Sequence, residues 1–388
     1  MSNLAIRWPA NQAELPKAAF HREDLFQREI ERIFLGPEWH PVAHRAELPK
    51  PGDFKTFRLG TAPIIAIHGE DGKIRVFFNS CTHRGTQLQT QARGHAKEVE
   101  CPYHRWLFNT CGDLLAAPGS ESFPESFRKQ DYNLRELRSS DYYGVIFVTA
   151  SPAAPALEDY LGELKPLFAK VLGDSRLTLL GYQKVMFSSN WKEYNDNEGY
   201  HAPLLHRAFR LLKWQAGKGT QRATEYGHVG LDAELQSVPN SDFLNDPSLV
   251  QCRDGTAPKS VIIALFPLAT VLKHIDVINI RLVIPHSVDE TEVHYAYFAH
   301  QDDDSAMLRH RLRQSSNLLG PSGFVSLEDG AVFNRIHQGS MTPGNVRYQK
   351  GIGAPIAPPC IVGQNDESAN PLRWEYYRKV MEIERERL

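Results

Sequence analysis

The sequence predicts an α+β protein in which a small all-β domain is inserted before a larger domain built on an antiparallel sheet. Residues 39–150 form short β-like runs between turns, and residues 261–298 contain three apolar runs separated by turn residues. Helical periodicity before and after these stretches predicts the α part. With 388 residues, the chain is long enough for about two hydrophobic cores.

The composition is that of a globular protein and excludes several classes of function. Hydrophobic residues make up 41% of the chain and charged residues 23%, which excludes disorder as the main state. The formal net charge of -2 predicts no general attraction to nucleic acid or to anionic membranes. The apolar run at residues 260–271 is too short to span a membrane, and the N-terminus does not have the pattern of a signal peptide. We therefore expect a cytoplasmic protein, and its five scattered cysteines are too few for a disulfide framework.

The sequence predicts one helix in the N-terminal part and a hairpin in the all-β domain. Residues 22–35 place apolar side chains at helical spacing, and Gly36-Pro37 ends the pattern. The runs 63–68 and 74–79 flank a Gly-rich turn, which is typical of a β-hairpin. A Pro/Ala-rich stretch at residues 151–156 predicts a linker.

The sequence of the second domain predicts a mixture of helices and strands. Its elements, in order, are a helix-like stretch at 157–172 that Pro166 interrupts, irregular polar loops at 207–254, strands at 261–266, 277–284 and 293–298, and helices at 304–319, 323–337 and 371–388. We expect an N-terminal helical segment (1–38) that packs on this domain, the all-β domain (39–150), and the second domain (151–388).

Two short loops each offer one thiolate and one imidazole. They read Cys81-Thr-His83-Arg-Gly and Cys101-Pro-Tyr-His104-Arg-Trp106. These donors suit zinc or an iron–sulfur cluster. A zinc finger usually takes both sulfurs from one knuckle, whereas here each loop supplies one Cys and one His. The pattern therefore favours a [2Fe–2S] cluster whose cysteines hold one iron and whose histidines hold the other, with a structural Cys₂His₂ zinc site as the alternative.

A second pair of histidines occurs in the larger domain. Two histidines and one carboxylate on one face hold non-haem iron that activates O₂. His201 and His206 are five residues apart, which separates them by about 140° on an ideal helix. Because Pro203 lies between them, a kinked or bulged turn could still direct both imidazoles to one ion. The alternative is two partly buried structural histidines.

These motifs resemble the large (α) subunits of the Rieske non-haem iron oxygenases, which comprise ring-hydroxylating dioxygenases and related monooxygenases. The resemblance covers both Cys/His loops, the stretch from Asn190 to His206, and Gly320-Pro-Ser-Gly with the later acid pair. It implies a Rieske domain followed by a helix-grip (START-like) catalytic domain. The implied ligands are Cys81, His83, Cys101 and His104 for the [2Fe–2S] cluster, and His201, His206 and Asp329, with Glu328 as the alternative acid, for a mononuclear Fe(II).

The chain departs from the family pattern just before the first iron-binding histidine. The family usually has an Asp three residues earlier, which bridges the two metal centres across a subunit boundary, whereas this chain has Glu198. The i−3 spacing puts Glu198 and His201 on one helical face, so Glu198 is the predicted bridge. The preceding segment is about two residues shorter than usual, which makes Asp196 the alternative bridge.

The resemblance also implies how the protein works and with which partners. A separate NAD(P)H reductase, directly or through a ferredoxin, would supply the electrons, since no dinucleotide-binding motif occurs here. Electrons would then cross between subunits of a head-to-tail homotrimer, with or without a β subunit, to activate O₂ as co-substrate. A protein that only transfers electrons or senses a ligand, with no oxygenase activity, is a less favoured alternative.

The substrate can be narrowed only to two classes. The sequence around the histidines and the acid pair looks like members that act on aromatic acids, and a carboxylated substrate needs a basic partner. The basic candidates are Arg207, Arg210, Lys213, Lys273 and Arg281. Glu198 instead looks like members that oxidise quaternary ammonium compounds, for which Tyr194 or Trp214 could form an aromatic cage. We expect hydroxylation of an aromatic, carboxylated substrate, with the amine as the alternative.

Overall fold

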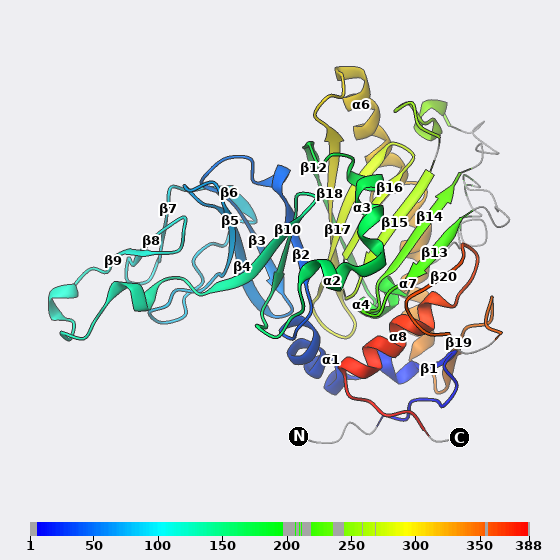
Figure 1. The fold of residues 1–388 in the computed structure, drawn as a ribbon, viewed down its shortest axis with the longest axis horizontal. Coiled ribbons are helices and arrows are strands. Elements are labelled where there is room, and N and C mark those ends of the chain that lie inside the picture. The colour runs from blue at the N-terminus through cyan, green and yellow to red at the C-terminus, as the bar shows by residue number, and fades with distance from the viewer. Residues whose placement is uncertain are drawn as a thin grey trace. The chain divides into compact units, whose positions relative to one another are not determined.

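The computed structural model describes most of the chain as two compact units (Figure 1). The described residues are 6–196, 206, 209, 211, 219–235, 244–257, 259–267, 269–353 and 356–386. The small unit is Phe34–Ala154, and the large unit combines Met1–Ile33 with Pro155–Leu388. None of the helices in these described ranges is long and apolar enough to cross a membrane.

The small unit is built on two antiparallel sheets. The seven-stranded sheet has the order β2 (His40–His44), β11 (Val145–Thr149), β10 (Glu136–Tyr142), β5 (Ile74–Phe78), β4 (Ala62–His68), β3 (Asp53–Leu59) and β6 (Arg93–His95). The three-stranded sheet consists of β7 (Glu98–Glu100), β8 (Leu107–Asn109) and β9 (Leu114–Ala116). The predicted hairpin is confirmed as β4 and β5, and alternate residues of β4 enter different cores.

The large unit contains an eight-stranded antiparallel sheet. Its order is β12 (Leu177–Phe187), β18 (Thr291–His300), β17 (Val277–Pro285), β16 (Ala269–His274), β15 (Lys259–Leu265), β14 (Val229–Glu234), β13 (Thr220–Ala223) and β20 (Cys360–Gly363). The three predicted apolar strands are confirmed as β15, β17 and β18, and β16 lies between β15 and β17. The expectation of irregular loops across 207–254 was wrong for β13 and β14, which pair with each other and with β20 and β15. Along β14 the buried Leu231 and Ala233 alternate with Asp232 and Glu234, as on a strand with one buried face.

Helices pack on both faces of this sheet. The outer face contacts α3 (Lys165–Leu172), which follows α2 (Leu157–Leu161), and Lys170 of α3 forms an ion pair with Asp232 of β14. The opposite face, called the inner face below, carries Arg281, which donates a hydrogen bond to Tyr194 of α4 (Trp191–Asn195). The inner face also carries Tyr295 and Tyr297, and α7 (Ser326–Ser340) packs against α4 beside it.

The remaining elements are short. They are β1 (Glu14–Pro16), paired with β19 (Asn345–Arg347), α1 (Glu23–Glu29), α6 (Ser305–Gln314), α8 (Ala369–Val380), two π-helical turns, η2 (Ile30–Phe34) and η8 (Ser315–Leu319), and the 3₁₀ turns η1 (Lys17–Phe20), η3 (Arg45–Glu47), η4 (Ser120–Ser122), η5 (Lys129–Tyr132), η6 (Gly162–Leu164) and η7 (Pro247–Val250). The predicted break at Pro166 was wrong: the helix breaks at Gly162, whose φ is +50°, and Pro166 lies in the first turn of α3, where its missing N–H costs little.

Candidate metal centres

The two Cys/His loops of the small unit have the same backbone arrangement. In the first loop, Cys81 N–H bonds to Thr86 O at 2.8 Å and Gly85 N–H bonds to Cys81 O at 2.9 Å. In the second loop, Cys101 N–H bonds to Trp106 O at 2.8 Å and Arg105 N–H bonds to Cys101 O at 3.1 Å. Both loops turn through positive φ at the fourth residue after the cysteine. The two loops therefore share a backbone conformation, although the His follows the Cys by two residues in the first loop and by three in the second.

The four side chains lie together, with sulfur inside and imidazole outside. Cys81 and Cys101 are 3% and 2% exposed within a hydrophobic cluster, whereas His83 is exposed. The His83 and His104 ring centroids are 4.7 Å apart, and His83 stacks on the buried Trp106 at 4.7 Å and 9°. The Nδ1 atom of His104 is buried with no hydrogen-bond partner among the described residues. This donor set fits a [2Fe–2S] cluster with thiolates on the inner iron and imidazoles on the outer iron.

The protonation of the thiols couples to metal binding. Burial raises the pKa of the Cys81 thiol, and the neighbouring Cys101 raises it further. A metal needs thiolates, so loading this site must release protons. Desolvation lowers the pKa of His83, with a smaller effect from His104, which favours the neutral imidazole that a metal requires.

Sequence reasoning missed the side chain that holds the first loop in place. Asn79 is fully buried, and its Oδ1 accepts hydrogen bonds from Leu88 N–H and Gln89 N–H at 3.2 and 2.9 Å. Its Nδ2 donates to Gln89 O at 2.7 Å. Because Asn79 lies two residues before Cys81, it closes the loop at both ends. An Asn after a strand gives no sequence signal for this role.

In the large unit, a buried ion pair anchors the helix that precedes the candidate iron ligands. Glu29 is 0% exposed, and its carboxylate accepts from Lys192 Nζ at 2.6 Å and from Trp191 Nε1 at 2.8 Å. The Tyr377 hydroxyl of α8 also donates to Glu29. Burial lowers the pKa of Lys192, and Glu29 opposes that shift. Three segments that are distant in sequence therefore meet at one carboxylate.

The same helix is tied to α7 through Glu193. Asn190 caps α4 by accepting from Lys192 N–H at 3.1 Å, while Glu193 accepts from Asn190 N–H at 2.9 Å. His337 of α7 donates from Nδ1 to Glu193 at 2.9 Å and from Nε2 to Asp289 at 3.0 Å. The hydrogen bond to Glu193 raises the pKa of His337, and Asp289 adds to the effect. His337 therefore links α4 to the helix that carries the acid pair.

The acid pair of α7 faces His206. The Nδ1 atom of His206 lies 3.2 Å from Glu328 Oε2, and its Nε2 atom lies 3.6 Å from Asp329 Oδ1. His206 is 3% exposed, so this contact is buried. Two ligand atoms at about 2.1 Å from one metal lie roughly 3 Å apart, which is near the Nε2–Oδ1 distance. The arrangement suits a metal shared by His206 and Asp329, with Glu328 orienting the imidazole.

Several predicted residues cannot be placed. His201 and Glu198 lie outside the described residues, as do Arg207, Arg210, Lys213 and Trp214. Asp196 is described, and it is an internal anchor. Its carboxylate accepts from Tyr348 Oη at 2.7 Å and from Trp374 Nε1 at 2.8 Å, and burial raises its pKa. These bonds make Asp196 unsuitable as the alternative bridge between metal centres.

Lys273 and Arg281, the two basic candidates among the described residues, have different surroundings. Lys273 faces away from the inner face and forms an ion pair with Asp254. Arg281 has no carboxylate partner among the described residues. Its Nε donates to Asn279 Oδ1 at 2.9 Å, its other two hydrogen bonds are 3.4 Å long, and its guanidinium lies 4.9 Å from the Tyr295 ring centroid. With three of its five N–H donors used, Arg281 retains two for another acceptor.

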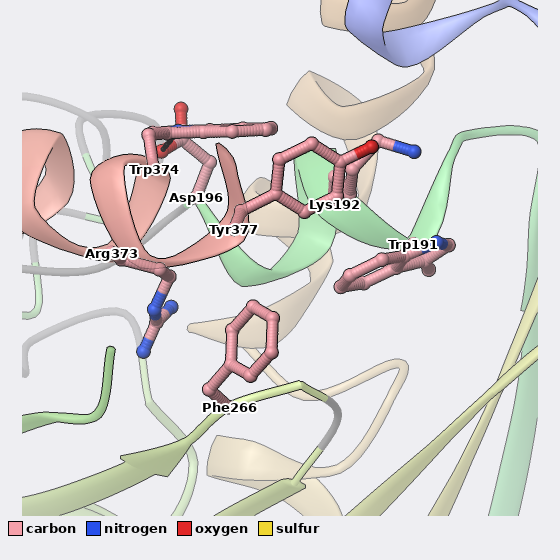
Figure 2. Close-up of a pocket in the computed structure, with 7 residues that line it drawn as sticks. All are labelled: Trp191, Lys192, Asp196, Phe266, Arg373, Trp374 and Tyr377. Carbon is pink, nitrogen blue, oxygen red and sulfur yellow. Dashed lines mark hydrogen bonds between the residues drawn. The ribbon is translucent and has the colours of Figure 1, made fainter. Parts of the chain in front are cut away.

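A pocket between α4, α8 and the turn after β15 is not a substrate site (Figure 2). Its lining residues are Trp191, Lys192, Asp196, Phe266, Arg373, Trp374 and Tyr377. The space holds about one water molecule. Figure 2 shows the aromatic rings of α8 directed toward α4, so the pocket is a gap in the packing around the anchored helix.

Comparison with known proteins establishes the class. Residues 38–131 match the Rieske [2Fe-2S] domain family, and residues 174–371 match the ring hydroxylating alpha subunit (catalytic domain) family. The chain therefore belongs to the ring-hydroxylating oxygenase alpha subunits. It is an oxidoreductase with a Rieske [2Fe–2S] cluster and a mononuclear iron.

Individual relatives and structures agree with this class. The chain is 29% identical over 366 residues to the large oxygenase component of salicylate 5-hydroxylase from Ralstonia sp, with 86% of each chain covered. It is 30% identical over 413 residues to the terminal oxygenase component subunit alpha 2 of terephthalate 1,2-dioxygenase from Comamonas sp, with 98% of each covered. A naphthalene 1,2-dioxygenase variant bound to phenanthrene shares the fold, with a TM-score of 0.82, 22% identity, and coverage of 98% of this chain and 96% of that chain.

The ion pair between Glu29 and Lys192 predicts that substitutions at these two positions have non-additive effects on the free energy of unfolding. Lys192→Met should lower the free energy of unfolding by about 3–5 kcal/mol, because it leaves a buried carboxylate without its cation. Adding Glu29→Gln should recover most of that loss, since the amide carries no charge. Urea unfolding of the single and double variants measures both effects. A double variant as unstable as the sum of the two single variants would contradict this account.

The raised pKa of His337 predicts that this residue makes a pH-dependent contribution to stability. Because its pKa is raised in the folded state, its contribution is complete below the unfolded value of about 6.5 and is lost as the pH rises through the folded value. The stability advantage of wild type over His337→Gln should therefore be larger at pH 6 than at pH 9. Urea unfolding at both pH values tests this, and an advantage that does not change with pH would show that folding leaves the pKa of His337 unchanged.

Proposed function

We propose that this chain is the oxygenase component of a multicomponent enzyme that hydroxylates a carboxylated aromatic substrate. A separate NAD(P)H reductase, directly or through a ferredoxin, supplies the electrons. When bound, the Rieske cluster supplies one-electron transfer and the mononuclear iron supplies O₂ activation. The observation that carries the substrate class is Arg281, a cation on the inner face with no carboxylate partner among the described residues.

We propose the metal ligands that the family resemblance implies. Cys81, His83, Cys101 and His104 hold the cluster, and His201, His206 and Asp329 hold the mononuclear iron. Support for Asp329 over Glu328 comes from His206, whose Nε2 faces Asp329 while its Nδ1 donates to Glu328. Glu328 then keeps the imidazole in the tautomer whose Nε2 is unprotonated and can bind the metal.

The exposed edge of the cluster site supports electron transfer between chains. His83 and the ring of Tyr103 are exposed, whereas both cysteines are buried, so a partner can approach only the imidazole side. We infer the family's head-to-tail homotrimer, with or without a β subunit. Glu198 would bridge His201 of one chain and His104 of the next.

Arg281 favours an aromatic acid over a quaternary amine. Two of the relatives described above are named for salicylate and terephthalate, which are both aromatic carboxylates. Arg281 contacts Tyr194 and lies over Tyr295, so a guanidinium occupies the position where an aromatic cage would hold an ammonium group. Like charges would repel there, whereas a carboxylate could take the two remaining N–H donors.

Turnover of a substrate panel tests the proposed function. The panel holds benzoate, salicylate, anthranilate, terephthalate and carnitine, with iron-loaded protein, a reductase, NADH and O₂, and with products identified by mass spectrometry. We expect hydroxylated aromatic acids and no oxidation of carnitine. Oxidised carnitine without any hydroxylated acid would contradict the proposal.

Arg281 gives the sharper prediction. Arg281→Met should lower kcat/KM for the preferred aromatic acid about 10- to 100-fold, because hydrogen bonds to a charged group are worth about 1.5–3 kcal/mol. Lys273→Met is the matched control, since it removes a cation from the other face of the same sheet. Equal effects of the two substitutions would remove Arg281 from the substrate site.

A further inference from the structure

His274 has a buried imidazole nitrogen that the protein does not satisfy. It is the last residue of β16 and is 7% exposed. Its Nδ1 lies 3.1 Å from Ser260 Oγ, directly across the strand pair. Its Nε2 has no hydrogen-bond partner among the described residues. A buried polar atom without a partner is unfavourable, and a polar group of a ligand can supply the missing hydrogen bond.

The strand register places this imidazole on the inner face. Thr270 is paired with Arg281, and Thr270 and His274 are four residues apart on β16, so their side chains share the face of Arg281. Lys273, between them, faces the other way toward Asp254. Burial lowers the pKa of His274 to about 4, and the nearby His206 and Arg281 lower it further. His274 is therefore a neutral hydrogen-bonding group near both the candidate iron site and the cation.

Distance along the strand separates the roles of His274 and Arg281. Four residues of a β-strand span about 14 Å, so the two side chains start from well-separated points on the face. This spacing of the backbone positions favours two separate ligand groups over one shared carboxylate. His274 would instead meet another part of a ligand whose carboxylate is bound by Arg281.

We propose that His274 is a specificity-determining residue that binds a second polar substituent on the aromatic acid. The inference rests on the proposed function and narrows its substrate class to aromatic acids with a hydroxyl, amino or second carboxylate group. The Ser260 hydroxyl can donate to Nδ1 or accept from it, so Nε2 can either donate to or accept from that substituent.

Substrate preference in two variants tests this assignment. The ratio of kcat/KM for the best of salicylate, anthranilate and terephthalate to kcat/KM for benzoate is measured with iron-loaded protein. We expect a ratio of at least ten in wild type, since a site built for a polar group discriminates against analogues without it. His274→Leu should reduce the ratio at least tenfold, and His274→Gln, which keeps a polar amide of similar reach, should retain more of it.

The possible outcomes separate the two proposals. A ratio that is the same in wild type and His274→Leu overturns the role of His274, while turnover of any aromatic acid upholds the proposed function. A wild-type enzyme that hydroxylates none of the acids overturns both. If His274→Leu does not load iron, His274→Asn, whose polar side chain is shorter, is measured in its place with the same two outcomes.

Discussion

The buried carboxylate of Glu29 is the contact on which the large unit depends. It accepts hydrogen bonds from Lys192 and Trp191 of α4 and from Tyr377 of α8. It therefore joins the N-terminal segment to α4, a helix of only five residues. Such a short helix has little stability of its own. Because α4 lies directly before the stretch that carries the histidines, its anchoring fixes where that stretch begins.

The carboxylate–imidazole contacts of α7 extend this constraint to the iron site. Glu193 binds His337, two turns along α7 from Asp329, while Glu328 and Asp329 lie 3.2 and 3.6 Å from the two nitrogens of His206. The positions of two candidate ligands are thus set by one helix that is held at both ends. The small unit uses a different solution, in which two backbone loops of the same geometry and a buried Asn place the four cluster ligands.

Local patterns made much of the chemistry predictable from sequence. The Cys/His loops are short, so their spacing is enough to predict the donor set. The long-range contacts were not predictable: Glu29 and Lys192 are 163 residues apart, and nothing near Glu29 marks it as an anchor. Asp329 and Glu328 could be compared only once His206, 122 residues away, was seen between them. Arg281 likewise differs from Lys273 by facing the inner side of the sheet and by having no acid beside it among the described residues, and both differences depend on strand pairing.

Iron content in two neighbouring variants tests the central claim most directly. Wild type should bind three irons per chain, two in the cluster and one at the mononuclear site. Asp329→Ala should lose one iron and keep the Rieske absorption, whereas Glu328→Gln should keep all three and bind the third more weakly. Loss of the third iron from Glu328→Gln, with full occupancy in Asp329→Ala, would contradict the account and make Glu328 the ligand.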